Sequence, residues 1–204
     1  MGAPKTQTRL RTKDKEYAAR LLGEEAIWWK RIVDVQILYR WNLRRMNLGF
    51  TLDIGCGIGR NLANLMGNGI GVDHNPHAVE IARLRGLQAY TPDEFECSSF
   101  NVPDGFDSIL LSHVAEHMAD HEVIKLLADH INLLKAQGQI VLITPQEYGH
   151  KADPTHVQFM DFQRLRNISR ESGLVFVKEF SFPFPRAFGR IFRYNEFVSI
   201  SRKP

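Results

Sequence analysis

The sequence has 204 residues, enough for one α/β domain with a sizeable core but too few for two ordinary domains and a linker. Hydrophobic residues make up 44% and charged residues 24% of the chain, so wholesale disorder is not expected. The net charge of +3 does not by itself favour a nucleic-acid partner. We expect one structural domain, with a basic tail and N-terminal helices over residues 1–46 and the main α/β unit over residues 47–204.

The cysteine content and the apolar runs bear on the cellular compartment. Cys56 and Cys97 make no disulfide framework, which fits a reducing compartment. No apolar run reaches the roughly 18 residues of a membrane span, and the N-terminus lacks the apolar core of a signal peptide. We therefore expect a cytoplasmic protein without a membrane span. Residues 1–20 are rich in lysine and arginine, and we interpret them as a solvated tail, with an arm that contacts an anionic substrate as the alternative.

Helical and strand-like patterns follow one another along the chain. Apolar residues recur at helical spacing over residues 13–46, where Gly23 separates two helices. Further helical patterns cover residues 76–85 and 120–135. Short apolar runs typical of buried strands in a parallel sheet are Phe50–Ile54, Gly69–Val72, Leu87–Tyr90, Ser108–Leu111 and Ile140–Ile143. This alternation predicts a doubly wound α/β sheet with right-handed crossovers.

The C-terminal part of the chain has a different pattern. A last helix over Phe162–Ser172 is stopped by Gly173, and two strands follow at Leu174–Phe182 and Glu196–Ser201. The segment between these strands is too short for a crossover helix, so we expect them to be antiparallel neighbours. The whole pattern predicts a mostly parallel, seven-stranded sheet with an antiparallel terminal strand.

The first predicted strand ends in a glycine-rich turn, Asp53-Ile54-Gly55-Cys56-Gly57-Ile58-Gly59-Arg60-Asn61. Glycine lets a ligand approach the backbone closely, and the following helix N-terminus offers unpaired N–H groups. The second strand ends in Asp73, and an acid about 20 residues after a glycine turn is the ribose-binding device of dinucleotide folds. The NAD fingerprint G-x-G-x-x-G does not fit, because Arg60 or Leu62 stands at its third glycine position.

The spacing G-x-G-x-G after Asp53 resembles motif I of the class I, Rossmann-like S-adenosylmethionine (SAM)-dependent methyltransferases. Phe106–His117 and Gly138–Thr144 look like the fourth and fifth strand motifs of that family, and the terminal strand pair matches its hairpin. The resemblance covers roughly residues 45–201 and identifies a small, single-domain type. It implies a transferase that binds SAM, releases S-adenosylhomocysteine (SAH) and uses its N-terminal helices as a lid.

The resemblance also implies roles for individual residues. Gly55 and Gly57 would pass under the methionine part of SAM, and Asp73 would accept hydrogen bonds from both ribose hydroxyls. Asp53 would support the glycine turn through its amides or a water. The other residues that the resemblance places at SAM are Cys56, Asn61, His74 beside the ribose or adenine, Glu94 and Phe95 at the adenine, and Ser112 and His113 at the amino group.

Six of the eight histidines lie between residues 113 and 156. The pattern His113-x-x-Glu116-His117 would put three metal-binding groups on one helical face. It is also the signature of some zinc peptidases, but here it follows a strand end inside a methyltransferase-like order of elements. A similar motif, E-x-x-E-H, holds a divalent cation in some class I enzymes that methylate RNA 3′ ends or quinone precursors, and His156 supplies a later histidine. We expect no metal, with a site at His113, Glu116, His117 and His156 as the alternative.

The histidines can also carry proton chemistry. A hydroxyl acceptor must lose a proton during methyl transfer, and an imidazole with a pKa near 6.5 suits a base at neutral pH. We take His113 and His156 as the candidate catalytic bases. Glu116 and His117 are instead interpreted as a brace, hydrogen-bonded to the loop before the last helix.

The acceptor side is less defined by the sequence. Trp28, Trp29, Tyr39 and Trp41 are interpreted as an aromatic helix face packed on the sheet, with an acceptor site as the alternative. Residues 148–156 and 182–193 lie where family members place substrate loops. The side chains there that could bind a sugar, phosphate or carboxylate are Arg186, Arg190 and Tyr194.

These features predict SAM-dependent methyl transfer to an oxygen of a small molecule, glycan or lipid-linked intermediate. The runner-up is an RNA or protein methyltransferase, and nucleic acid remains an acceptor that we do not favour. Two hypotheses from other classes are a SAM- or SAH-binding module without catalysis and an NAD-linked oxidoreductase. The identity of the acceptor and the oligomeric state are not determined by the sequence, since folds of this kind host many substrates.

Overall fold

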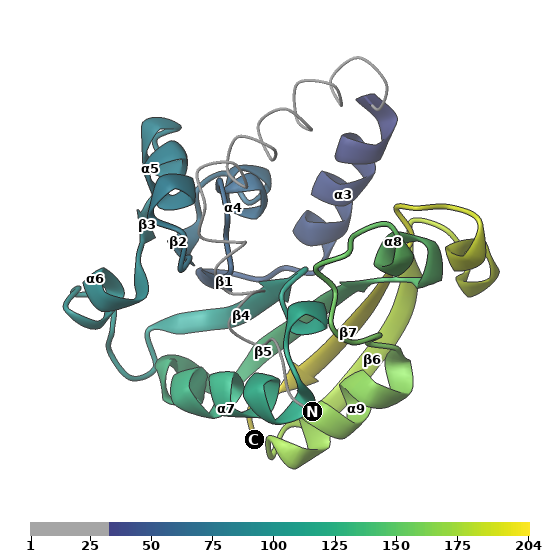
Figure 1. Ribbon diagram of the computed structural model, residues 1–204. Coiled ribbons are helices and arrows are strands. Elements are labelled where there is room, and N and C mark those ends of the chain that lie inside the picture. Colours follow the sequence, from purple (N-terminus) through teal and green to yellow (C-terminus); the bar gives the residue numbers. More distant parts are fainter. Residues whose placement is uncertain (1–32) are drawn as a thin grey trace, which may run out of the picture.

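The computed structural model describes residues 33–204, which form an α/β structure with helices on both faces of one sheet (Figure 1). The sheet has seven strands in the order β3-β2-β1-β4-β5-β7-β6, where β7 is antiparallel to both of its neighbours. Its strands are β1 (Thr51–Ile54), β2 (Gly69–Val72), β3 (Ala89–Tyr90), β4 (Phe106–Ser112), β5 (Leu134–Pro145), β6 (Val175–Phe182) and β7 (Glu196–Arg202). The predicted mostly parallel sheet with an antiparallel terminal strand is therefore confirmed.

Two layers of helices cover the sheet. Figure 1 shows α3 (Val33–Arg45), α4 (Arg60–Asn64) and α5 (Pro76–Leu84) on one face. The opposite face is covered by α7 (Asp120–His130) and α9 (Phe162–Glu171). Shorter elements are α6 (Pro92–Glu96), α8 (Glu147–Lys151) and the 3-10 turns η1 (Ala115–His117), η2 (Ile131–Leu133) and η3 (Arg186–Arg190). The predicted tail, the break at Gly23 and the pair Trp28 and Trp29 lie outside the described residues.

The central strands are buried on both faces, which explains their continuous apolar runs. In β4, Ile109 and Leu111 pack into the layer of α7 and α9, whereas Leu110 packs into the layer of α3. Full burial of such a side chain is worth about 1.5–3 kcal/mol. Strand β5 repeats this alternation, so the sheet joins two hydrophobic layers into one core.

Some elements differ from their predicted bounds for physical reasons. The apolar run Ile140–Ile143 lies within the second half of the twelve-residue strand β5, because Lys135, Ala136 and Gln137 near its start are exposed. The predicted helix over residues 120–135 ends at His130, where a 3-10 turn begins. Helices α4, α6 and α8 have five residues each, too few to give a periodic signal.

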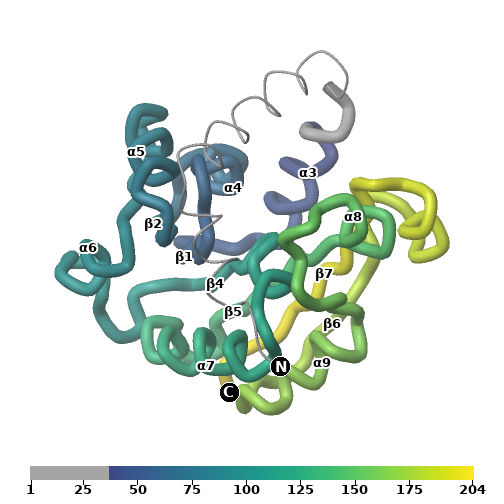
Figure 2. The backbone as a smooth tube through the Cα atoms, viewed as in Figure 1, coloured from purple at the N-terminus to yellow at the C-terminus, as the bar shows by residue number. Residues whose placement is uncertain are grey.

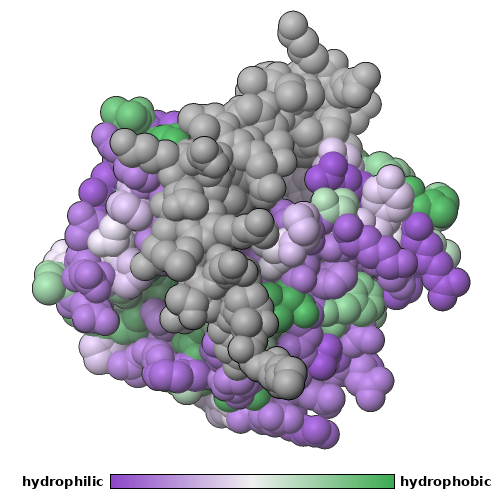
Figure 3. All heavy atoms as spheres, viewed as in Figure 1, coloured by the Kyte–Doolittle hydropathy of each residue, from purple (hydrophilic) through white to green (hydrophobic). Residues whose placement is uncertain are grey.

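One edge of the sheet gathers the ends of several strands. Register places Leu111 of β4 beside Ile54 of β1, and Glu196 of β7 beside Pro145 of β5. Figure 2 shows α8 and the segment that contains η3 next to each other beyond this edge. The coloured residues visible in Figure 3 are mainly hydrophilic, with hydrophobic colour in separate small groups. None of the described helices has both the length and the apolar composition to cross a membrane.

Candidate functional site

The turn after β1 has a backbone that side chains would disturb. Gly55, Gly57 and Gly59 have φ values of 76°, 53° and 81°, in the left-handed region that favours glycine. A Cβ atom on Gly55 would also overlap Cγ2 of Val114. The N–H groups of Gly55 and Cys56 donate to the carbonyl of Val72 at 2.7 and 3.2 Å, so the turn is anchored to the end of β2. The predicted glycine turn is therefore a preformed backbone surface.

Asp73 is fixed against this turn by main-chain donors. Gly57 N–H donates to its Oδ2 at 2.7 Å, and Asn75 N–H donates to its Oδ1 at 2.8 Å. The residue is only 8% exposed. Each carboxylate oxygen has a second acceptor direction, so Asp73 can still accept bonds from two ligand hydroxyls. His74 lies beside it, with Nδ1 at 3.7 Å from Asp73 Oδ1 and its side chain open to solvent.

Asp53 makes no direct hydrogen bond to the turn amides, which were one of its two predicted ways of supporting the turn. Its Oδ1 accepts a bond from Asn61 Nδ2 at 3.4 Å, whereas the turn amides bond to Asp73 and to Val72. Its Oδ2 is buried without a partner, and burial, with a smaller effect of Asp73, raises the pKa of Asp53 to about 7. An unpartnered buried oxygen beside a glycine turn fits a ligand that brings a polar donor, as SAM does.

Three other predicted cofactor contacts have their side chains engaged in the fold. Cys56 lies under the turn, where its Sγ would overlap a Cβ on Gly71, so it can offer only main-chain atoms. Phe95 is a core residue and is 3% exposed. Glu94 pairs with Arg83 at 2.6 Å and closes the capping box of α6. Ser112, the last residue of β4, is half-buried at the edge where the ligand is expected.

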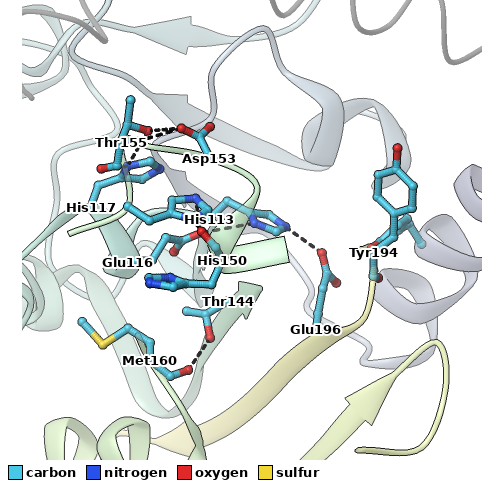
Figure 4. Close-up of polar contacts among 12 residues, drawn as sticks. His113, Glu116, His117, Thr144, His150, Asp153, Thr155, Met160, Tyr194 and Glu196 are labelled. Carbon is cyan, nitrogen blue, oxygen red and sulfur yellow. Dashed lines mark hydrogen bonds and ion pairs between the residues drawn. The ribbon is translucent and has the colours of Figure 1, made fainter. Parts of the chain in front are cut away.

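His113 lies between two buried carboxylates (Figure 4). Its Nε2 is 2.6 Å from Oε1 of Glu196, and its Nδ1 is 3.2 Å from Oε1 of Glu116. The residue has a φ of 59°, which is unusual for a non-glycine, and its N–H donates to the carbonyl of Ile143 at 2.9 Å. This backbone conformation therefore directs the imidazole between the two acids.

The two carboxylates control the protonation of this histidine. Burial by itself would lower the pKa of His113, but Glu196 and then Glu116 outweigh that effect and raise it to about 10. The imidazole is therefore protonated at neutral pH and has no lone pair with which to accept a proton. This state does not fit the base predicted at His113.

Glu196 is a site residue that the sequence analysis did not single out. It opens β7, and a charged residue at the start of a strand that is buried up to Ser201 was the only signal for it. Tyr39 of α3 lies next to it, and burial followed by Glu196 raises the pKa of the Tyr39 hydroxyl well above its usual value. That hydroxyl donates to the carbonyl of Tyr194 at 2.6 Å, so α3 is tied to the start of β7.

The aromatic face of α3 packs as predicted over its described part. Tyr39 and Trp41 both contact Phe182 of β6, with ring centroids 5.8 and 6.4 Å apart. The guanidinium of Arg45 also lies over Trp41, with its Cζ 4.4 Å from the ring centroid, and over Phe180 of β6 at 4.8 Å. These contacts give the aromatic residues a role in holding α3 on the sheet.

Glu116 and His117 hold the loop that precedes α9. The carbonyl of Glu116 accepts a bond from Val157 N–H at 2.8 Å, and His117 Nδ1 is 3.1 Å from the carbonyl of Thr155. This geometry is the predicted brace, formed by a 3-10 turn rather than by an α-helix. His156 lies in the same loop, and its Nδ1 is 2.8 Å from the carbonyl of His150. Burial lowers the pKa of His156, so its imidazole is neutral.

Of the four residues considered for a metal, three come together. Glu116, His117 and His156 each offer a ligand atom, and these atoms all lie within 4.8 Å of one another. His113 is not a member of this group, and both of its ring nitrogens face carboxylates. The three residues could hold a cation.

A pocket of about 520 Å³ lies between α8 and η3, on the side of the molecule where substrate loops are predicted. It is lined by Glu147, Tyr148, Lys151, Ala152 and Arg190. Arg186 forms a two-pronged ion pair with Glu147, with Nη1 at 2.8 Å from Oε2 and Nη2 against Oε1. Of the three predicted acceptor-binding side chains, Arg190 therefore lines the pocket, and Arg186 is engaged with a neighbour.

Buried amides hold the pocket walls against the sheet. Gln146, which follows β5, donates from Nε2 to the carbonyl of Glu196 at 2.9 Å and to Ser181 Oγ at 2.8 Å. Its Oε1 accepts a bond from Asn195 Nδ2 at 2.9 Å. A Cβ on Gly189 would overlap this oxygen, so η3 approaches as closely as glycine permits. The pocket is thus built directly onto the edge that carries Glu196.

Comparison with known proteins agrees with this geometry. The family described as "Methyltransferase domain" matches residues 41–179, more than half of the chain, so the chain belongs to this family. A TehB-like SAM-dependent methyltransferase from Corynebacterium glutamicum has a TM-score of 0.68 and 18% identity, over 94% of this chain and 100% of that one. A SAM-dependent methyltransferase from Archaeoglobus fulgidus has a TM-score of 0.60 and 22% identity, over 82% of this chain and 94% of that one.

At these identities the structural likeness shows the fold alone. No curated protein sequence matches the chain. The family match, the sheet order and the glycine turn with Asp73 together define a class I SAM-dependent methyltransferase. The NAD-linked alternative has no support from these findings.

Proposed function

We propose that this methyltransferase methylates an oxygen of a small acceptor that carries an acidic group, and that the pocket between α8 and η3 binds that group. The supporting observation is the charge of the pocket. Glu147 is neutralised by Arg186, whereas Lys151 and Arg190 have no carboxylate in ion-pair distance among the described residues. A volume of about 520 Å³ also lies within the usual range of small-molecule sites.

The position of the pocket supports the same proposal. Helix α8 begins two residues after β5 ends, at the sheet edge that also carries the glycine turn and His113. SAM supplies an electrophilic methyl group on a sulfonium. The protein must then align the acceptor, and alignment alone can remove a large part of the barrier. A cationic pocket beside the edge gives an acidic acceptor a fixed orientation there.

The two candidate bases have different parts in this proposal. His113 is a positioning residue that keeps Glu116 and Glu196 in place, since both of its nitrogens are engaged. His156 is neutral, and it is therefore the histidine that could accept a proton from the acceptor. Glycans and lipid-linked intermediates with a phosphate or uronate group fit the same pocket chemistry.

The test is a methylation screen with isotope-labelled SAM against lysate fractions from the native host. We expect a labelled, non-polymeric product that binds to an anion exchanger and survives treatment with nuclease or protease. Label that disappears with nuclease or protease would favour the RNA or protein alternative. Alongside the screen, the protein is titrated calorimetrically with SAH and, separately, with NADH, and we expect binding of SAH only. Binding of SAH without any labelled product would favour the non-catalytic alternative.

The pocket makes a separate prediction once an acceptor is available. Replacing Lys151 or Arg190 with glutamine is expected to raise the KM for the acceptor roughly 10- to 100-fold, as for loss of a charge-assisted contact. The dissociation constant of SAH should not change. Arg202→Gln is the matched control, because Arg202 is exposed at the opposite end of β7. Equal effects of all three variants on KM would contradict the pocket assignment.

A further inference from the structure

We propose that Glu116, His117 and His156 form a binding site for a divalent transition-metal ion, which nothing in the family match assigns. The three residues come from η1 and from the loop before α9, two segments separated by about 40 residues. Their ligand atoms all lie within 4.8 Å of one another. The rings of His117 and His156 are in contact, with centroids 4.9 Å apart.

Hydrogen bonds orient the two imidazoles as metal ligands. Nδ1 of His156 faces the carbonyl of His150, which only accepts, so Nδ1 carries the hydrogen and Nε2 carries the lone pair. That Nε2 atom lies 3.9 Å from Oε1 of Glu116. Metal-binding histidines characteristically donate their second ring nitrogen to a backbone carbonyl or a carboxylate.

The same argument sets the tautomer of His117. Its Nδ1 is 3.1 Å from the carbonyl of Thr155 and 3.3 Å from the Thr155 hydroxyl oxygen. That hydroxyl donates its own hydrogen to Asp153 at 2.7 Å, so towards His117 it can only accept. Nδ1 of His117 is therefore the donor, and Nε2 keeps its lone pair. Both imidazoles are held in the tautomer that a metal ion requires.

The carboxylate of Glu116 supplies the anionic ligand. The residue is fully buried; its Oε1 lies 3.2 Å from Nδ1 of His113, and its Oε2 is buried without a hydrogen-bond partner. Buried carboxylates are normally paired or bound to a metal. Figure 4 shows Glu116 between His113 and the loop residues, and the ring of His113 is turned towards Glu196.

The two carboxyl groups around His113 favour a cation beside Glu116. Glu116 and Glu196 are both buried and share the imidazole of His113, so two carboxyl groups have a single basic partner. Among the described residues, no lysine or arginine lies within ion-pair distance of either carboxylate. A divalent cation beside Glu116 removes this imbalance.

The donor set also limits the kind of metal. Two imidazole nitrogens with one carboxylate suit Zn²⁺ or another first-row transition ion better than Mg²⁺ or Ca²⁺, which take mostly oxygen ligands. Zinc bonds of about 2.0–2.2 Å require the ligand atoms to approach by roughly an ångström, which side-chain rotation can supply. Three protein ligands leave a coordination position open. If the proposed function holds, a bound ion would occupy Nε2 of His156 and would take over its part as base, because an acceptor hydroxyl at the open position would have its pKa lowered by the ion.

Metal binding is tested on the full chain without any acceptor. The chelator-treated protein is dialysed against Zn²⁺, and bound metal is measured by elemental analysis, with Co²⁺ visible absorption as a second readout. We expect about one equivalent of Zn²⁺ and a tetrahedral or five-coordinate Co²⁺ spectrum. Glu116→Gln and His156→Ala should lose both. A variant of His117 is not used, because His117 also holds the loop before α9. Glu116→Gln and His156→Ala are therefore the decisive variants.

The controls separate a site from surface binding. His121→Ala removes a histidine from α7, and His150→Ala keeps the carbonyl that faces His156; both should bind metal like the wild type. Circular dichroism and SAH binding establish that each variant is folded. The proposal is overturned if the folded wild type binds neither ion, or if Glu116→Gln and His156→Ala keep full stoichiometry. Metal binding by a protein that methylates no acid-bearing acceptor would overturn the proposed function alone.

Discussion

Replacing Asp73 with alanine is expected to weaken SAH binding by roughly 30- to 150-fold, or about 2–3 kcal/mol. The physical reason is that its carboxylate is held beside the glycine turn by two main-chain donors, with acceptor directions left for ligand hydroxyls. Hydrogen bonds to a charged acceptor are stronger than bonds between neutral groups, so two of them make a large contribution. Calorimetric titration with SAH at constant pH measures the change.

Controls separate ligand contact from damage to the turn. Asp93→Ala removes an exposed acid from α6 and should leave the affinity for SAH unchanged. Asp73→Asn keeps one oxygen that can accept from Asn75 or Gly57, while its NH2 group faces the other main-chain N–H, so its unfolding temperature measures how much the turn depends on these two bonds. The role assigned to Asp73 is wrong if Asp73→Ala is folded and binds SAH as tightly as Asp93→Ala does.

The parts of the fold that could be predicted are those whose signal is local. Strand β2 was predicted with its observed bounds, Gly69–Val72, because all four of its residues are buried and polar residues flank it. Strand β5 was predicted at a third of its length, because three consecutive residues near its start, Lys135, Ala136 and Gln137, are exposed and interrupt the apolar pattern. Burial pattern, rather than strand formation itself, is what the sequence displays.

The site residues that could be predicted are likewise those with a local signal. The glycine turn and Asp73 lie in short segments with a fixed spacing, so sequence spacing was enough to relate them. The pairing of His113 with Glu196 joins residues 83 positions apart, and it depends on the insertion of β7 next to β5. The unusual φ of His113 then decides where its ring points. Neither the strand insertion nor this dihedral angle has a local signal, so the sequence could not show that both ring nitrogens of His113 face carboxylates.

Asp53→Asn is expected to change how the stability of the ligand-free protein depends on pH. Burial raises the pKa of Asp53 from 3.8 to about 7 in the folded chain. Between these values the folded state keeps the proton and the unfolded state has lost it, so the free energy of unfolding falls as pH rises. Each unit of pKa difference between the folded and unfolded states corresponds to about 1.36 kcal/mol, so the free energy of unfolding is lowered by about 4 kcal/mol near pH 7. Asparagine does not titrate, so the variant avoids this cost.

Urea unfolding of both proteins at several pH values between about 4 and 8 measures the difference. We expect the advantage of the variant to grow with pH and to level off above pH 7, and a difference that is constant with pH would contradict the assignment. The same variant should bind SAH more weakly, because Oδ2 of Asp53 is a buried acceptor without a partner in the fold. Asp53 thus destabilises the ligand-free protein, and its Oδ2 can accept a hydrogen bond from a ligand. We therefore attribute its presence to ligand binding, since function can maintain a destabilising residue.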